Sequence, residues 1–506
     1  MNKKYFDRLH GKRIAMFGIG IMQADLIGLL KISISYYVCD MVEENGDVML
    51  ENAPLHSSEY LLTDNRDDLF VIISNNDEDY AQRKLESMGF VEGIQFCFGV
   101  DLLFEYACNN KFHKPTRIWG TGPTFQYHYD DVIPFLNDIR SYILSDISGE
   151  DTEFQGRHVE AFSNFNADED DFILVCSLHY KDIGFQLKNR GFFPGINCIN
   201  IKTFVKLIKF ANFTETLYEF DNRSRQSQNI VIILSGYKPL LYESVFPRLK
   251  KYIPSNFDVV VVTSGKTVNA LRHMCAEYEW SYISTLRNNV SLALNIAIML
   301  FSQSKMIWKI DEDIFVTQDC FELMAETYHH IEHNTRYEVG FVTPILNVNG
   351  YGYVRLLELM NSVKNWEKYF GELKYTDCYT HHAAIHDSSN AAMFMWGKDN
   401  QSLQDIDYLA EKLRKLPFSY SLCPIRYSIG FILFSRHSWI RMELFPVTDK
   451  MNLGSDEEHI CNFCLMSAHV IGVAENAIAG HLSYGPQHKT MEQFYRDNKQ
   501  MFLLKE

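Results

Sequence analysis

The N-terminal part of the chain carries an internal repeat, and this repeat constrains the fold more than any other feature of the sequence. Three pairs of apolar stretches match in the same order, with the shared glycines of the first and third pairs 102 positions apart and the second pair 103 positions apart. The pairs are RIAMFGIG (13–20) with RIWGTG (117–122), DLFVIIS (68–74) with DFILVCS (171–177), and MGFVEGIQF (88–96) with RGFFPGINC (190–198). Matches in one order at nearly constant spacing indicate a duplication, so residues 1–112 and 113–212 are predicted to be two copies of one unit.

Each copy has the pattern of a dinucleotide-binding fold. Apolar strand segments alternate with helix-like segments, which predicts a parallel sheet, and a Gly-x-Gly turn after the first strand would let a phosphate approach a helix N-terminus. Asp40 lies 20 residues beyond Gly20, where a ribose-binding acid belongs, and Asp146 is the looser equivalent in the second copy. Both copies lack the third glycine of the fingerprint, so cofactor binding competes with a structural or docking role. The candidate cofactor-binding residues are Gly18, Gly20, Asp40, Gly120 and Gly122.

The apolar pattern lapses over residues 213–228 into a polar, charged stretch that is typical of a linker. It restarts at residue 229 with NIVIILSGYKP, followed by helix-like residues 240–253 and by the buried strand pattern FDVVVVTSG at 257–265. Strands and helices alternate again, so residues 229–506 are predicted to form a third domain that begins as an open α/β sheet.

Three consecutive acids interrupt an apolar strand pattern at 306–321, MIWKIDEDIFVTQDCF. Burying an unpaired carboxylate is costly, and Asp311 and Asp313 point to the same side of an extended segment because they are two residues apart. Ligands of open α/β sheets bind at the carboxyl ends of the strands, where a hard divalent cation with oxygen ligands would offset the repulsion. Such a cation can also hold a diphosphate and stabilise a leaving nucleoside diphosphate.

From Asn229 to His481 the sequence resembles the GT-A glycosyltransferases of the family 2 type. Asp311-Glu312-Asp313 matches their Asp-x-Asp signature, which ends a strand and binds a nucleotide sugar through Mn²⁺ or Mg²⁺. The N-terminal copies resemble the Rossmann-like domains found beside bacterial sugar-modifying enzymes, which need not bind a nucleotide. The resemblance therefore implies an α/β chain in which two tandem Rossmann-like units precede a GT-A domain.

The same resemblance assigns site residues. The implied metal ligands are Asp311, Asp313 and His481. The implied donor-binding residues are Ser235, Ser264, Asn288, Asn289, Asn295, Asp311 and Glu312. The acid cluster in LGSDEEHICNF (453–463) stands where inverting members carry the general base, with Asp456 and Glu457 as the candidates. Acids in this position could instead complement a helix dipole.

These features predict a metal-dependent glycosyltransferase that moves a sugar from a nucleoside-diphosphate donor to a hydroxyl of a glycan, glycoconjugate or lipid-linked acceptor. A base in the acid cluster favours inversion at the anomeric carbon. Two alternatives stay open. One is a nucleotidyltransferase, whose glycine-rich phosphate loop is poorly matched by LSGYKPLLYE at 234–243. The other is a nucleotide-binding or docking protein in which the tandem N-terminal units carry the function.

Charge and apolar runs limit the partners that we expect. The chain has 48 basic and 64 acidic residues and a net charge of −16, which argues against a dedicated nucleic-acid binder. No run approaches the roughly 20 apolar residues of a membrane-spanning helix. The 11 cysteines lack a disulfide spacing, so a cytoplasmic protein is expected. The basic patch of Lys412, Arg414 and Lys415 would support no more than weak contact with an anionic membrane surface.

Overall fold

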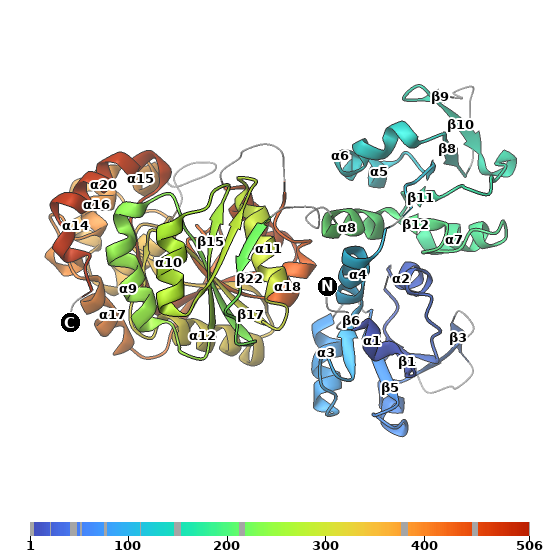
Figure 1. Ribbon diagram of the computed structural model, residues 1–506, viewed down its shortest axis with the longest axis horizontal. Helices are drawn as coiled ribbons and strands as arrows, with labels where there is room; N and C mark the ends of the chain where they lie inside the picture. The colour runs from blue at the N-terminus through green and yellow to red at the C-terminus, as the bar shows by residue number, and fades with distance from the viewer. Residues whose placement is uncertain are drawn as a thin grey trace. The chain divides into compact units, whose positions relative to one another are not determined.

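The computed structural model forms two compact units, Met1–Thr214 and Glu215–Glu506 (Figure 1). It describes the whole chain except residues 1–4, 21, 41–47, 51–52, 75–77, 112, 146–152, 212–217, 376–382, 448–453 and 505–506. No helix in the described part of the chain combines the length and the apolar character needed to cross a membrane.

The first unit contains two six-stranded sheets with the same strand order, β3-β4-β2-β1-β5-β6 and β9-β10-β8-β7-β11-β12. The first sheet consists of β1 (Arg13–Phe17), β2 (Tyr36–Val38), β3 (Met49–Leu50), β4 (Ala53–His56), β5 (Leu69–Ile73) and β6 (Phe96–Phe98). The second consists of β7 (Arg117–Trp119), β8 (Ser141–Leu144), β9 (Glu153–Phe154), β10 (Arg157–Ala161), β11 (Ile173–Val175) and β12 (Cys198–Asn200). Neighbouring strands pair in parallel except in the hairpins β3–β4 and β9–β10. The prediction of parallel α/β sheets is therefore confirmed.

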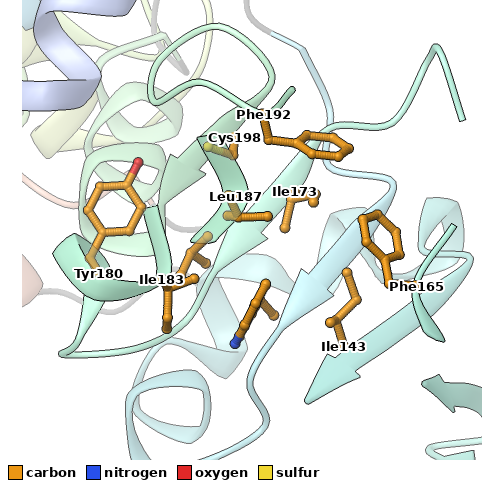
Figure 2. Packing of buried hydrophobic residues seen from close by; sticks show 10 residues of the cluster. Ile143, Phe165, Ile173, Tyr180, Ile183, Leu187, Phe192 and Cys198 are labelled. Carbon is orange, nitrogen blue, oxygen red and sulfur yellow. The ribbon is translucent and has the colours of Figure 1, made fainter. Parts of the chain in front are cut away.

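Helices cover both sheets of the first unit, which explains why a strand such as β5 is apolar along its whole length and buried on both faces. In the second sheet, Ile143 and Ile173 belong to the same buried cluster as Ile183 and Leu187 of a covering helix (Figure 2). The helices are α1 (Phe6–Leu9), α2 (Gln23–Leu30), α3 (Glu78–Ser87), α4 (Gly99–Asn109), α5 (Pro123–Tyr127), α6 (Tyr129–Val132), α7 (Tyr180–Lys188) and α8 (Ile201–Ala211), with 3₁₀ turns η1 (Ser58–Thr63), η2 (Ile133–Asp138) and η3 (Phe162–Asn164).

The two halves of the first unit meet in a close and partly polar interface. Equivalent helices α4 and α8 pack together, with the rings of Phe104 and Phe210 5.3 Å apart. Asp25 of α2 is fully buried and accepts hydrogen bonds from the Tyr180 hydroxyl and, at 3.1 Å, from the backbone N–H of Asn200. A carboxylate of one half is thus enclosed by donors of the other half.

The second unit is built on one large sheet in the order β13-β16-β15-β14-β17-β21-β19-β22-β18, and β20 pairs with β22. Strands β16, β15, β14 and β17 are mutually parallel, whereas β21 runs antiparallel between β17 and β19. The strands are β13 (Tyr218–Asp221), β14 (Asn229–Leu234), β15 (Asp258–Ser264), β16 (Ser281–Thr285), β17 (Met306–Asp311), β18 (Ile314–Phe315), β19 (Glu338–Leu346), β20 (Tyr420–Cys423), β21 (Phe431–Ser435) and β22 (His469–His481).

Helices follow most of these strands. They are α9 (Tyr242–Tyr252), α10 (Asn269–Tyr278), α11 (Val290–Leu300), α12 (Cys320–Asn334), α13 (Gly352–Leu359), α14 (Val363–Phe370), α15 (Ala383–His386), α16 (Ser389–Met395), α17 (Ile406–Arg414), α18 (Arg436–Arg441), α19 (Ser455–Met466) and α20 (His488–Asp497). The 3₁₀ turns are η4 (Pro239–Leu241), η5 (Gln401–Leu403), η6 (Gly485–Gln487) and η7 (Lys499–Met501).

The predicted linker, residues 213–228, contains a short strand in its middle. Residues 213–217 lie outside the described residues, but β13 pairs antiparallel with β16 at the edge of the large sheet. The Asp221 carboxylate is held there by Arg272 at 2.7 Å. Because β13 is an edge strand with no buried residue, its polar side chains resemble those of a linker.

Candidate functional site

The candidate site lies where the parallel strands of the second unit end. Leu234 at the end of β14 pairs with Asp311 at the end of β17. The turn Ser235–Lys238 therefore lies beside the three consecutive acids, although 75 positions separate Lys238 from Asp313. This is the edge of an open α/β sheet at which ligands bind.

Glu312, the central acid, faces the turn after β14. Its carboxylate accepts hydrogen bonds from the Ser235 hydroxyl at 3.1 Å, the Gly236 N–H at 2.8 Å and the Tyr237 N–H at 3.0 Å. Both Glu312 and Ser235 are buried. In the structure Ser235 and Glu312 hydrogen-bond to each other, and Glu312 fixes the backbone of the turn. Their role in donor binding stays a prediction.

Asp313 is buried beside two nitrogen-bearing side chains. The Lys238 ammonium lies 2.5 Å from Asp313 Oδ2, and His481 Nε2 lies 3.8 Å from the same oxygen. Burial alone would raise the pKa of Asp313, but the ammonium of Lys238 holds it below its ordinary value. Asp313 is therefore ionised, and in this structure its Oδ2 atom is paired with Lys238.

His481 is held in one orientation by the end of β19. The backbone pairing of β18 with β22 sets it opposite Ile314. Its Nδ1 lies 2.7 Å from the Val348 carbonyl oxygen, to which it donates, and Asn347 Oδ1 accepts from the His481 N–H at 2.8 Å. Burial lowers the pKa of His481, so the neutral ring presents the Nε2 lone pair to Asp313. Metal-binding histidines are commonly oriented by such a second hydrogen bond.

Asp311 is paired with a different lysine. Lys309, buried in β17, donates to the Asp311 carboxylate at 2.7 Å and to the Ile429 carbonyl oxygen at 2.8 Å. Burial raises the pKa of Asp311 to about 6, and Lys309 limits the rise. Asp311 is thus neutralised by the protein itself.

The three predicted metal ligands do not close into a compact cluster. In the part of the chain that the structure describes, two other groups of three metal-ligating residues have all their ligand atoms within 4.8 Å of one another. One group is His329, Glu332 and His333, and the other is Asp168, Asp170 and Asp171. Without Asp311, the predicted metal site has two protein ligands, the carboxylate of Asp313 and the imidazole of His481. Sites for Mg²⁺ in nucleotide enzymes use one or two carboxylates together with substrate phosphates, and imidazole suits Mn²⁺ sites as well. The pair therefore fits a metal that is held jointly with a diphosphate.

Predicted donor-binding residues also meet at the ends of β15 and β16. Ser264 Oγ accepts from the Asn289 N–H at 2.8 Å, and the Asn289 side chain caps α11 by accepting from the Leu292 N–H at 2.9 Å. The exposed Asn288 accepts from the Tyr237 hydroxyl at 3.2 Å. These contacts connect the turn after β14 to the start of α11.

Asn295 is buried in α11, away from this edge network. Its side-chain oxygen accepts from Trp439 Nε1 at 3.0 Å and from the Phe445 N–H at 3.1 Å, and its amide donates to the Phe445 carbonyl oxygen at 2.9 Å. Asn295 therefore positions the segment that follows α18.

The two candidate bases lie in the first turn of α19. Arg426 Nε lies 2.6 Å from the Glu457 carboxylate, and burial raises the pKa of Glu457 although Arg426 opposes the rise. The charge of Asp456 lies near enough to Asp311 to raise the pKa of Asp311. Among the described residues, none donates a hydrogen bond to the Asp456 carboxylate. Asp456 thus has the freer carboxylate.

The glycines of the first unit have unequal roles. Gly18 and Gly120 have φ of +87° and +92°, which favour glycine. A Cβ atom at Gly20 would lie 2.6 Å from the Ser74 carbonyl oxygen, whereas one at Gly122 would meet nothing within 4 Å. Gly20 therefore serves close backbone packing that the second copy does not share.

Asp40 is bound within its own unit. It accepts from the Ser58 N–H at 3.0 Å and from the Tyr80 hydroxyl. Burial raises the pKa of Asp40, but these hydrogen bonds outweigh it and bring the pKa below its ordinary value. Asp146 lies outside the described residues. The structure therefore gives Asp40 a local structural contact at the position predicted to bind ribose.

Sequence reasoning missed three residues that line the site: Lys238, Asn347 and His488. His488 Nδ1 lies 3.0 Å from the Ser483 hydroxyl, and burial and the nearby Lys238 lower the pKa of His488. Asn347 follows the buried strand β19 directly. A polar residue immediately after a buried strand is the signal that could have indicated Asn347, because strand ends position ligand-binding groups.

No protein-family model and no curated protein matches the chain. Among solved structures, it is similar to a mannosyltransferase, PcManGT from Pyrobaculum calidifontis, in complex with GDP-Man and Mn²⁺ (TM-score 0.30, 13% identity, 55% of this chain and 64% of that one). It is also similar to GalNAc-T7 with UDP, GalNAc and Mn²⁺ (TM-score 0.32, 11% identity, 51% of this chain and 44% of that one). The match spans less than two thirds of either structure. Likenesses this distant do not define the activity of the chain.

Proposed function

We propose that the second unit is a metal-dependent glycosyltransferase. It would transfer a sugar from a nucleoside-diphosphate donor to a hydroxyl of a glycan, glycoconjugate or lipid-linked acceptor, with Mn²⁺ or Mg²⁺ as cofactor. The supporting observation is the pairing of ionised Asp313 with the oriented, neutral imidazole of His481, 3.8 Å apart at the carboxyl edge of the parallel strands. A carboxylate and an imidazole in that place suit a cation that shares a diphosphate.

Different residues of the site have different roles in the proposed binding of metal and donor. Asp313 and His481 would hold the cation, which supplies positive charge for the diphosphate leaving group when bound. Glu312 holds the turn after β14 in place, so that this turn is ordered before the donor arrives. Asn288 and Asn289 extend the same edge toward the nucleotide.

Proton transfer from the acceptor is proposed for Asp456. A general base needs a carboxylate that can reach the acceptor hydroxyl and take its proton. The Glu457 carboxylate forms an ion pair with Arg426 at 2.6 Å, so Glu457 is the weaker candidate of the two. A base on the acceptor side supports direct displacement and hence inversion at the anomeric carbon.

The test is isothermal titration of the full chain with UDP, GDP and CDP, each with and without Mn²⁺. We expect one nucleotide to bind only when Mn²⁺ is present, and Asp313→Asn to weaken that binding at least about 100-fold, because a lost metal ligand costs more than a lost supporting contact. The control is Glu326→Gln, which removes an exposed acid of α12 and should change nothing. Thermal unfolding of each variant checks that it is folded.

Two results would contradict the proposal. Equal nucleotide binding with and without Mn²⁺ would remove the metal from the function. Binding of NAD that is indifferent to both Mn²⁺ and Asp313→Asn would instead support a nucleotide-binding role for the first unit.

A further inference from the structure

Lys238 occupies the oxygen that a metal would need. Its ammonium lies 2.5 Å from Asp313 Oδ2, the same atom that faces His481 Nε2 at 3.8 Å. The Lys238 side chain is only 20% exposed and that of Asp313 only 5%. An unpaired carboxylate at that depth would be strongly unfavourable, so Lys238 compensates the charge of Asp313 in the ligand-free site.

A cation bound by Asp313 and His481 would bring two positive charges close to this ammonium. Repulsion between like charges is strong where water is largely excluded. The backbone of the turn cannot follow, because Glu312 clamps the N–H groups of Gly236 and Tyr237 at 2.8 and 3.0 Å. The lysine side chain is flexible over four carbons, so the ammonium can leave Asp313 while the turn stays fixed.

We infer that Lys238 exchanges partners: it pairs with Asp313 in the free protein and binds the diphosphate of the donor when the metal takes its place. The inference rests on the proposed function and adds a residue to it. A diphosphate that shared the metal with Asp313 would present anionic oxygens near the turn that carries Lys238, and charge-assisted hydrogen bonds to phosphate are among the strongest available to lysine. Metal and nucleotide should then bind together, and each should bind poorly alone.

Exchange predicts opposite effects of one substitution. Lys238→Met removes the competitor for Asp313, so Mn²⁺ alone should bind more tightly. It also removes a contact to the diphosphate, so the nucleotide should bind less tightly at saturating Mn²⁺. A purely structural lysine would weaken both, because its loss would disorder the site.

The experiment measures free Mn²⁺ by electron paramagnetic resonance during titration of the full chain without nucleotide. Isothermal titration at saturating Mn²⁺ follows, with whichever of UDP, GDP and CDP binds the unsubstituted protein best. We expect Lys238→Met to bind Mn²⁺ about 10-fold more tightly and the nucleotide about 10-fold or more weakly, the scale of one charge-assisted hydrogen bond. Lys250→Met is the matched control, since Lys250 is exposed near the far end of α9, and it should change neither affinity.

A second readout guards against loss of folding. Without metal, Lys238→Met leaves Asp313 without its lysine partner, so the melting temperature of the variant should fall. Mn²⁺ alone should then raise the melting temperature of the variant more than that of the unsubstituted protein. Lys238→Ala should repeat the pattern. Weakening of both Mn²⁺ and nucleotide binding, or of neither, would overturn the exchange. Absence of any Mn²⁺-dependent nucleotide binding in the unsubstituted protein would instead overturn the proposed function.

Discussion

Asp311, Glu312 and Asp313 each have a different partner in the folded chain. Lys309 pairs with the first acid, the N–H groups of the turn after β14 bind the second, and Lys238 pairs with the third. Each carboxylate is therefore compensated by the protein, and their mutual repulsion does not prevent them from ending a buried strand. Among the described residues, the third acid is the one that also faces a neutral imidazole, which is why we propose Asp313 as the metal ligand.

Sequence reasoning could indicate the acids and His481 but not all of their roles. Two acids spaced by one residue lie on the same side only of a continuous strand, but β17 ends at Asp311, and Glu312 and Asp313 lie in the turn that follows it. The partners of Glu312 and Asp313 lie 75 to 77 positions earlier in the chain. Their proximity arises from the pairing of β14 with β17, which no local pattern encodes.

Asp25 provides a residue-level prediction for the first unit. Burial raises its pKa to about 7, against the lowering effect of hydrogen bonds from Tyr180 and from the Asn200 backbone. A raised pKa means that the folded state holds the proton, so stability from this group is present below pH 3.8 and is lost as the pH rises through about 7. The loss would be on the order of 4 kcal/mol.

Asp25→Asn removes this titration. We expect the difference in stability between Asp25→Asn and the unsubstituted protein to shift in favour of the variant between pH 4 and pH 8. Hydrogen exchange of α2 and β12 in the full chain, measured at both pH values, follows the first unit directly. A difference that stays constant with pH would show that Asp25 has an ordinary pKa.

At the scale of elements, packing between the halves of the first unit depends on two glycines. A Cβ atom at Gly28 of α2 would lie 1.9 Å from the Pro194 carbonyl oxygen, and one at Gly195 would lie 2.1 Å from the Asp25 carbonyl oxygen. The backbone of α2 thus touches the turn before β12 without intervening side chains. Such approach is possible only where no Cβ exists.

Gly28→Ala should therefore destabilise the first unit by roughly 1 to 3 kcal/mol, as overpacking does elsewhere. The matched control is Gly184→Ala in α7, whose Cβ would meet Pro194 Cγ at an ordinary 3.9 Å. Alanine at Gly184 should be neutral or stabilising, because alanine favours a helix interior more than glycine does. Urea unfolding monitored by hydrogen exchange of α2 and α7 separates the two, and equal effects would argue against the clash.

Elements were predictable from sequence where periodicity was strong. The apolar runs of β5 and β15 predict buried parallel strands, and both strands are buried along their whole length. The edge strand β13 was not predictable, because its residues are polar and its pairing with β16 joins segments more than 60 positions apart. Local composition cannot distinguish such a strand from a linker.

At the scale of the whole molecule, the repeat copies share one compact unit and the large sheet forms the other. One strand order recurs in the two smaller sheets, and their origin by duplication stays a prediction from the sequence. The sequence could not reveal that Asp25 of one copy is enclosed by the other, because that interface depends on tertiary packing alone.

Two units with separate cores should respond separately to ligands. We expect calorimetry of the full chain to show two unfolding transitions. Mn²⁺ together with its nucleotide, at about 100 times Kd, should raise the temperature of only one transition, by about 5 to 10 °C, because a ligand that binds only the native state stabilises it by mass action. Asp25→Asn, which alters the first unit, should shift only the other transition. If ligand and substitution moved the same transition, or if one transition contained the whole heat, the two units would unfold cooperatively. The first unit would then contribute to the stability of the proposed active site rather than stand apart from it.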